Sequence, residues 1–305
     1  MQIFSRPQQA VRQVSATGAV RPLEHLLELR DGLRTYCREY VGPTQEWPVV
    51  CLPGITRNCR DFEDLAPELA RTRRVFTPDL RGRGRSDRDP DWRRYNLDSY
   101  VADVVALMDH FALGRVVIIG TSLGGIIGMT LGARHPQRLA GLVLNDIGPE
   151  LDPVGLQRIG SSVGEPLSVV DWDAAAERAR VGYAAILPDY TPDAWQKFAR
   201  RIYREIAPGR IERDMDPGIA RALAEYRGGP QDFWQEFGLL TALPMLCLRG
   251  EWSDLLSAAT LRAMQRAHPQ LQTVTITARG HTPTLDEPAS RAAINAFLAT
   301  LPRAV

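Results

Sequence analysis

The segment from Val116 to Gly125 constrains the fold of this chain more than any other feature. It reads Val-Val-Ile-Ile-Gly-Thr-Ser-Leu-Gly-Gly, so an apolar run ends in the pattern Gly-x-Ser-x-Gly around Ser122. A second uncharged run follows it, which is typical of a buried helix. A serine placed between a strand and a helix lies on a sharp turn, where only glycine fits at the positions of closest approach. The segment therefore predicts a strand, a tight turn and a helix, with the Ser122 hydroxyl at the turn.

Short apolar runs alternate with helical patterns on both sides of this segment. We expect a hairpin around Asp31-Gly32, and further strands at residues 48–52, 74–78, 115–120, 139–144, 245–249 and 273–276. Strands that alternate with helices in this way build a sheet that is covered on both faces. The fold class is therefore α/β, with a mostly parallel central sheet flanked by helices.

The alternation stops after the sixth strand, and the chain becomes helical and rich in aromatic residues. The expected organisation is a flexible N-terminal tail at 1–22, a first core part at 23–148, a helical cap at 149–243 and a second core part at 244–305. We expect most aromatic side chains of the cap to pack its helices together, and as a group to roof an apolar pocket.

The charge balance excludes several classes of function. The chain has 37 basic and 36 acidic residues and a net charge of +1, so binding to nucleic acid or to a membrane is not expected. Lys197 is the single lysine, and it does not lie in a phosphate-binding loop. The four cysteines form no Cys-x-x-Cys pair, and the first twenty residues lack the apolar core of a signal peptide. We expect a soluble cytoplasmic protein without metal or cofactor, which binds a small-molecule substrate and is compatible with a homo-oligomer.

A serine hydroxyl needs a base before it acts as a nucleophile. Four of the five histidines lie in the first strand or at helix ends, where structural roles are expected: His25, His110, His135 and His268. His281 differs, because it lies in a loop between the last strand and the last helix. Loops at the carboxyl ends of strands carry the chemistry of α/β sheets, so we expect His281 to be the base.

The base needs an acid that orients it, on a loop after another strand. Asp254, which follows the strand at 245–248, is our prediction, because it gives the order Ser, Asp, His along the chain. Two alternatives stay open. Glu251 is nearer to the end of that strand, and Asp146 follows the preceding strand.

Negative charge that develops on a substrate oxygen needs two backbone donors. One is the N–H of Leu123, next to the nucleophile. The second is expected in the loop after the strand at 49–52, which begins Pro53-Gly54-Ile55. Gly54 permits a close approach, so the N–H of Ile55 is the expected donor.

Together these motifs resemble the α/β-hydrolase superfamily over nearly the whole chain. The shared segments are Pro53-Gly54, residues 79–86 (Asp-Leu-Arg-Gly-Arg-Gly-Arg-Ser), the turn at 120–124, Asp254 and Gly280-His281. The chain looks most like the small bacterial members with helical caps. Many relatives have His-Gly where this chain has Pro53-Gly54, and a backbone donor survives that change. Ser122 excludes the haloalkane dehalogenases of the fold, which carry aspartate at this position.

The resemblance implies a serine hydrolase that cleaves a small, largely apolar carboxylic ester or lactone through an acyl-enzyme. Two alternatives remain: a carbon–carbon bond hydrolase that acts on a ring-cleavage diketone, and a non-catalytic receptor for a small molecule. A diketone of that kind carries a carboxylate, which Arg57, beside Asn58, would bind by a bidentate contact. The other interpretation is that Arg57 pairs with Asp61 or is a solvated loop residue.

Overall fold

The computed structural model describes residues 13–14, 20–163, 168–225 and 232–304. Its central element is an eight-stranded sheet with the strand order β13-β12-β8-β7-β5-β6-β4-β3. The strands are β3 (Leu23–Glu28), β4 (Arg34–Tyr40), β5 (Val49–Leu52), β6 (Val75–Pro78), β7 (Val116–Thr121), β8 (Leu139–Asn145), β12 (Met245–Gly250) and β13 (Gln272–Ile276). Each expected strand is present, with bounds that differ by a residue or two.

The sheet is mostly parallel, as predicted. The hairpin β3–β4 and the pair β4–β6 are antiparallel, and the other five neighbouring pairs are parallel. β7 lies between β5 and β8, and β8 lies between β7 and β12. The carboxyl ends of β5, β7, β8 and β12 therefore meet at one edge of the sheet, where loops from distant parts of the sequence come together.

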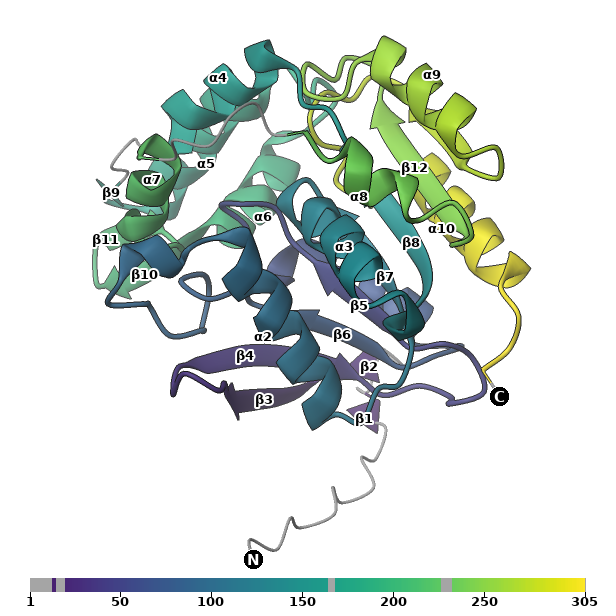
Figure 1. Ribbon diagram of the computed structural model, residues 1–305. Helices are drawn as coiled ribbons and strands as arrows, with labels where there is room; N and C mark the ends of the chain where they lie inside the picture. The colour runs from purple at the N-terminus through teal and green to yellow at the C-terminus, as the bar shows by residue number, and fades with distance from the viewer. Residues whose placement is uncertain (1–12, 15–19, 164–167, 226–231, 305) are drawn as a thin grey trace, which may run out of the picture.

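Helices cover both faces of this sheet (Figure 1). One apolar cluster joins it to α2 (Leu97–His110), α3 (Leu123–Arg134), α8 (Trp234–Gly238) and α9 (Ala258–Ala267), and a second joins it to α1 (Leu65–Leu69) and α10 (Pro288–Thr300). Alternate residues of one strand point to opposite faces. Within β5, for example, Val50 and Leu52 belong to the first cluster, and Val49 and Cys51 belong to the second.

The insertion after β8, the sixth strand of the main sheet, forms the expected cap. It contains α4 (Pro153–Val163), β9 (Ser168–Val169), α5 (Trp172–Tyr183), α6 (Pro192–Ile202), β10 (Tyr203–Ala207), β11 (Arg210–Arg213), α7 (Pro217–Ala224) and α8. The three strands form a small antiparallel sheet that the sequence did not predict. In Figure 1 the elements α4 to α7 lie over one end of the main sheet.

Other expectations concern the first residues and the chain as a whole. Gln13–Val14 (β1) pairs with Val20–Arg21 (β2), and the rest of the predicted tail up to Val20 lies outside the described residues. All four cysteines are buried free thiols. Among the described residues, no helix combines the length and the apolar character that crossing a membrane requires.

Candidate active site

Ser122 occupies the turn between β7 and α3 in a strained backbone conformation. Its φ is 51° and its ψ is −115°, a combination that L-residues rarely adopt. A methyl group on Gly120 would overlap the backbone of Gly124, and one on Gly124 would overlap the carbonyl of Leu52. The prediction that only glycine fits on either side of Ser122 is confirmed.

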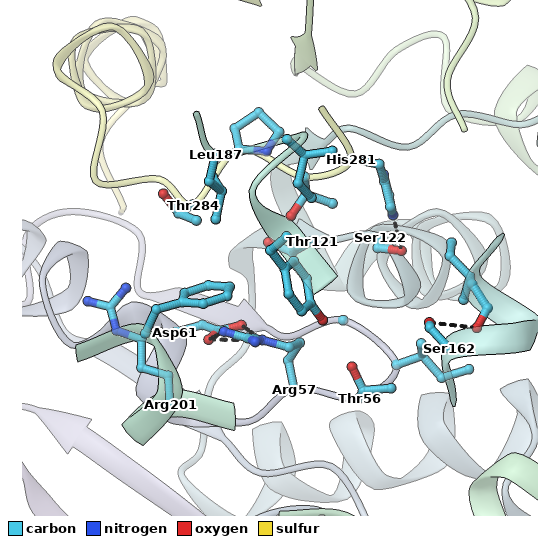
Figure 2. A pocket seen from close by; sticks show the side chains of 18 of the residues that line it. Thr56, Arg57, Asp61, Thr121, Ser122, Ser162, Leu187, Arg201, His281 and Thr284 are labelled. Carbon is cyan, nitrogen blue, oxygen red and sulfur yellow. Dashed lines mark hydrogen bonds and ion pairs between the residues drawn. The ribbon is translucent and has the colours of Figure 1, made fainter. Parts of the chain in front are cut away.

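His281 lies beside this serine, on the loop that connects β13 to α10. Its Nε2 is 3.0 Å from Ser122 Oγ, and its side chain is buried. Figure 2 marks this contact with a dashed line. The structure therefore brings together the two residues that the sequence singled out, although 159 positions separate them.

Asp146, the residue after β8, lies on the other side of the imidazole. Its Oδ2 is 2.8 Å from Nδ1 of His281 and also accepts a hydrogen bond from Ser253 Oγ at 2.7 Å. Its Oδ1 accepts a hydrogen bond from the Gly250 backbone N–H at 2.7 Å. The carboxylate is fully buried and oriented by three donors.

The expectation that Asp254 contacts His281 is therefore wrong, and the alternative Asp146 takes that position. Asp254 binds Arg158 of α4 instead, with Oδ2 2.5 Å from Nε and Oδ1 2.8 Å from Nη2. Burial acts to raise the pKa of Asp254, but the hydrogen bonds and charge of Arg158 and the charge of His281 outweigh it, so the pKa is lowered. Glu251 accepts a hydrogen bond from the Ala278 backbone N–H and, among the described residues, has none to His281.

The two expected backbone donors belong to segments that lie next to the serine. Leu123 begins α3, and Gly54 lies so close to Ser122 that a methyl group on it would be 3.8 Å from the serine Cβ. In the described part of the chain, the N–H groups of Ile55 and Leu123 have no hydrogen-bond partner. The carbonyl of Ile55 accepts a hydrogen bond of 2.8 Å from Nε of the buried Arg83. This contact holds the backbone of the loop after β5 at Ile55.

A pocket of about 830 Å³, open solvent at its mouth included, extends from Ser122 between the core and the cap. The core supplies the loop after β5 and the loop after β13, and the cap supplies one face of α4, the chain from Tyr183 to Leu187, and two side chains of α6. Figure 2 shows Ser162 of α4 and Arg201 of α6 on opposite sides of Arg57. The size suits a small organic molecule.

Most aromatic residues of the cap pack its helices together, as expected, and few of them reach the pocket. Trp195 and Tyr203 are buried in the apolar cluster of the cap, which they share with Phe198. Of the nine cap aromatics that the structure describes, only Tyr183 and Phe198 line the pocket. The pocket wall is consequently less aromatic and more polar than the sequence suggested.

The two expected substrate-binding residues have different surroundings. Arg57 lines the pocket, but Asp61 binds its Nε and Nη2, and its guanidinium packs on the ring of Phe198. Asn58 does not line the pocket. Its Oδ1 accepts from the Arg60 backbone N–H and its Nδ2 donates to the backbone carbonyl of Arg201, so a role for Asn58 in binding substrate is not supported.

Sequence reasoning missed Arg158, which lines the pocket from the cap. Its helix shows the spacing of an amphipathic helix, and nothing in the local sequence distinguishes Arg158 from a solvated arginine. Asp146 was among the alternatives because it directly follows a strand, and the structure shows that this strand is adjacent in the sheet to the strand of the serine.

The model of the alpha/beta hydrolase fold family matches residues 48–288. A 3-hydroxybutyrate-oligomer hydrolase from Cupriavidus necator is 31% identical over 259 residues, which cover 82% of this chain and 88% of that protein. A 2-hydroxy-6-oxo-2,4-heptadienoate hydrolase from Pseudomonas putida is 28% identical over 184 residues, which cover 60% of this chain and 59% of that protein.

A solved structure is more similar still. The crystal structure of an alpha/beta hydrolase from Novosphingobium aromaticivorans is 43% identical and superposes with a TM-score of 0.87, covering 92% of this chain and 98% of that one. The likeness extends over the sheet and the inserted cap alike.

Proposed function

The chain belongs to the α/β-hydrolase family and is a hydrolase, and we propose that it cleaves small carboxylic esters or lactones with Ser122 as nucleophile. The observation that carries the proposal is the hydrogen-bonded chain from Ser122 Oγ to His281 Nε2, at 3.0 Å, and from His281 Nδ1 to Asp146 Oδ2, at 2.8 Å. This is the arrangement that makes a hydroxyl nucleophilic.

In the first half of the reaction, His281 accepts the proton of Ser122 while Oγ attacks the carbonyl carbon of the ester. The carbonyl oxygen becomes negatively charged, and the N–H groups of Ile55 and Leu123, which have no hydrogen-bond partner within the described ranges, stabilise it. His281 then gives its proton to the alcohol as the alcohol leaves, and the acyl group remains on Ser122. Asp146 holds the imidazole in the tautomer with hydrogen on Nδ1 and stabilises its cation.

In the second half, water attacks the acyl-enzyme. His281 takes a proton from the water and returns it to Ser122 Oγ, which releases the carboxylic acid. The stabilising N–H groups are used twice, because both halves pass through a negatively charged tetrahedral intermediate.

Ester hydrolysis is supported by the relative from Cupriavidus necator, which is named for oligomers of 3-hydroxybutyrate and matches this chain over most of its length. A fluorophosphonate probe tests the nucleophile. We expect intact mass spectrometry to show one adduct on the wild-type protein and none on Ser122→Ala. No adduct, or one that Ser122→Ala retains, would contradict the proposal and favour the receptor alternative.

Carbon–carbon bond hydrolysis remains a second candidate, because the relative from Pseudomonas putida is named for a dienoate substrate. The contact that this alternative relied on is already occupied, since Asp61 binds Arg57. Turnover of a ring-cleavage diketone compared with short 4-nitrophenyl esters distinguishes the two. We expect faster turnover of the esters, and a marked preference for the diketone would reverse the order of the candidates.

A further inference from the structure

Three arginines line the pocket, and they differ in accessibility. The side chains of Arg57 and Arg201 are only 12% and 4% exposed, whereas that of Arg158 is 40% exposed. Arg57 is bound by Asp61, and Arg201 by Asp64. Arg158 is therefore the pocket arginine that a ligand reaches most easily.

Its contact with Asp254 leaves part of the guanidinium free. Asp254 uses the edge formed by Nε and Nη2, and within the described ranges Nη1 has no partner. A guanidinium carries five N–H donors in a plane, so the edge formed by Nη1 and Nη2 keeps donors that suit a second carboxylate. Asp254 thus holds Arg158 in place and leaves that edge available to a ligand.

The pair of Arg158 and Asp254 lies on the histidine side of the serine. Ser253, the residue before Asp254, donates to the same Asp146 oxygen that His281 contacts. The start of α4 packs on the same loop, because the Asp152 backbone N–H donates to the carbonyl of Leu255 at 2.9 Å. The expected donor for the substrate oxygen, Ile55, belongs to a different loop, the one after β5.

This position decides which part of an ester faces Arg158. His281 protonates the leaving alcohol, so the alcohol portion lies on the histidine side, whereas the carbonyl oxygen lies toward the backbone donors. An anionic group near Arg158 would belong to the alcohol portion.

We propose that Arg158 binds a carboxylate on the alcohol portion of the substrate, so that the preferred substrates are esters of hydroxy acids. The inference rests on the proposed ester hydrolysis and specifies its substrate class. Hydrolysis of such an ester consumes one water and releases a carboxylic acid from the acyl side and a hydroxy acid from the alcohol side.

The test compares 3-(butanoyloxy)butanoate with its neutral carboxamide, 3-(butanoyloxy)butanamide, because both release butanoate on hydrolysis. We expect kcat/KM to favour the carboxylate, and Arg158→Gln to lower the ratio of the two kcat/KM values by about tenfold to a hundredfold, the size expected for charge-assisted hydrogen bonds. Arg180→Gln is the matched control, since Arg180 lies on the exposed face of α5 and pairs only with Glu177 among the described residues. A ratio near one in the wild type, or one that Arg158→Gln leaves intact, overturns the proposal.

Two further measurements separate binding of the carboxylate by Arg158 from repulsion by Asp254, and test which side of the ester carries the charge. Arg158→Gln exposes the charge of Asp254, so the double variant Arg158→Gln/Asp254→Asn is measured as well. If the double variant recovers the acid-to-amide ratio of kcat/KM, repulsion by Asp254 caused the loss.

Ethyl hydrogen succinate carries the carboxylate on the acyl side of the ester. An equal or greater preference for it over its amide would place the subsite elsewhere.

Binding separates this inference from the proposed function. In the Ser122→Ala background, calorimetry should show tighter binding of 3-(butanoyloxy)butanoate than of the amide, and the difference should disappear with Arg158→Gln. Absence of fluorophosphonate labelling at Ser122 contradicts the proposed function alone. Equal binding of acid and amide contradicts the role of Arg158 even if Ser122 is labelled.

Discussion

Asp146 Oδ2 lies 2.8 Å from Nδ1 of His281, and the two residues follow different strands of the same sheet. A carboxylate can only accept, so Nδ1 of the neutral imidazole carries the hydrogen and Nε2 is left to accept the proton of Ser122. The acid cannot turn away, because its backbone N–H donates to Leu248 and its Oδ1 accepts from Gly250. The backbone of β12 therefore holds the Asp146 carboxylate in one orientation, and the carboxylate in turn orients the imidazole.

Asp146→Asn should lower kcat for 4-nitrophenyl butanoate by about 10⁴-fold, because asparagine favours the wrong histidine tautomer. Steady-state kinetics check this expectation, and circular dichroism shows whether the variant is folded. Asp254→Asn is the control, since Asp254 contacts Arg158 and not the imidazole. We expect it to keep kcat on this neutral ester within about tenfold, because it removes no hydrogen bond to His281. The opposite pattern would return the role to Asp254.

Gly124→Ala should destabilise the protein, because the new methyl group would overlap the carbonyl of Leu52 and two elements of the core would have to separate. We expect a loss of about 1–3 kcal/mol in the free energy of unfolding, as for other overpacked sites. Gly160→Ala, on the exposed face of α4 with no atom within 4 Å, should instead gain about 0.5–1 kcal/mol. Urea unfolding followed by tryptophan fluorescence measures both. Equal effects of the two substitutions would refute the close approach at Gly124.

The sequence predicted the main sheet well because its strands are short, uninterrupted apolar runs. β5 and β7 are buried at every position, so their pattern is unmistakable. The small sheet of the cap escaped prediction for the opposite reason. β10 reads Tyr-Arg-Glu-Ile-Ala and is mostly exposed, and β9 has only two residues. Neither carries the apolar alternation that identifies a strand.

The site was predictable where local sequence determines geometry, and not where tertiary packing does. The turn around Ser122 is a local motif, and His281 was identified because structural roles accounted for the remaining histidines. The acid had no such signal, because β8 and β12 are neighbours and the loops after both strands reach the same edge. Asp146 follows its strand directly, whereas Asp254 lies four residues past Gly250. Asp254 binds Arg158 of the cap and does not contact His281.

The ion pair between Asp254 and Arg158 should stabilise the protein at neutral pH and lose this effect in acid. The pKa of Asp254 is lowered below its ordinary value of 3.8, so the unfolded chain takes up a proton before the native one does. The contribution is therefore complete above about pH 5 and is lost as the pH falls through the lowered native pKa. A double-mutant cycle with Asp254→Asn and Arg158→Gln, measured by urea unfolding between pH 7 and pH 3, isolates the coupling energy. A coupling that stayed constant down to pH 3 would contradict this assignment.

Arg83→Lys should lower kcat more than it changes KM, because Arg83 supports the loop whose Ile55 N–H we propose to stabilise the transition state. Nε of Arg83 donates to the carbonyl of Ile55 at 2.8 Å, and Nη1 donates to the carbonyl of Arg81 and to the hydroxyl of Tyr100. A lysine cannot make these three contacts together, so the N–H of Ile55 would lose its fixed direction.

Loss of a backbone donor of this kind costs about 10²–10³-fold in kcat when it is complete, and we expect about tenfold to a hundredfold for its displacement. Tyr100→Phe is the control, because it removes one hydrogen bond from Nη1 and leaves the contact with Ile55 in place. Kinetics with 4-nitrophenyl butanoate, together with thermal unfolding, separate an effect on the loop from an effect on folding. A group that acts only in the transition state must affect kcat. A folded Arg83→Lys variant with unchanged kcat, or with a change in KM alone, would therefore show that the orientation of Ile55 does not depend on Arg83.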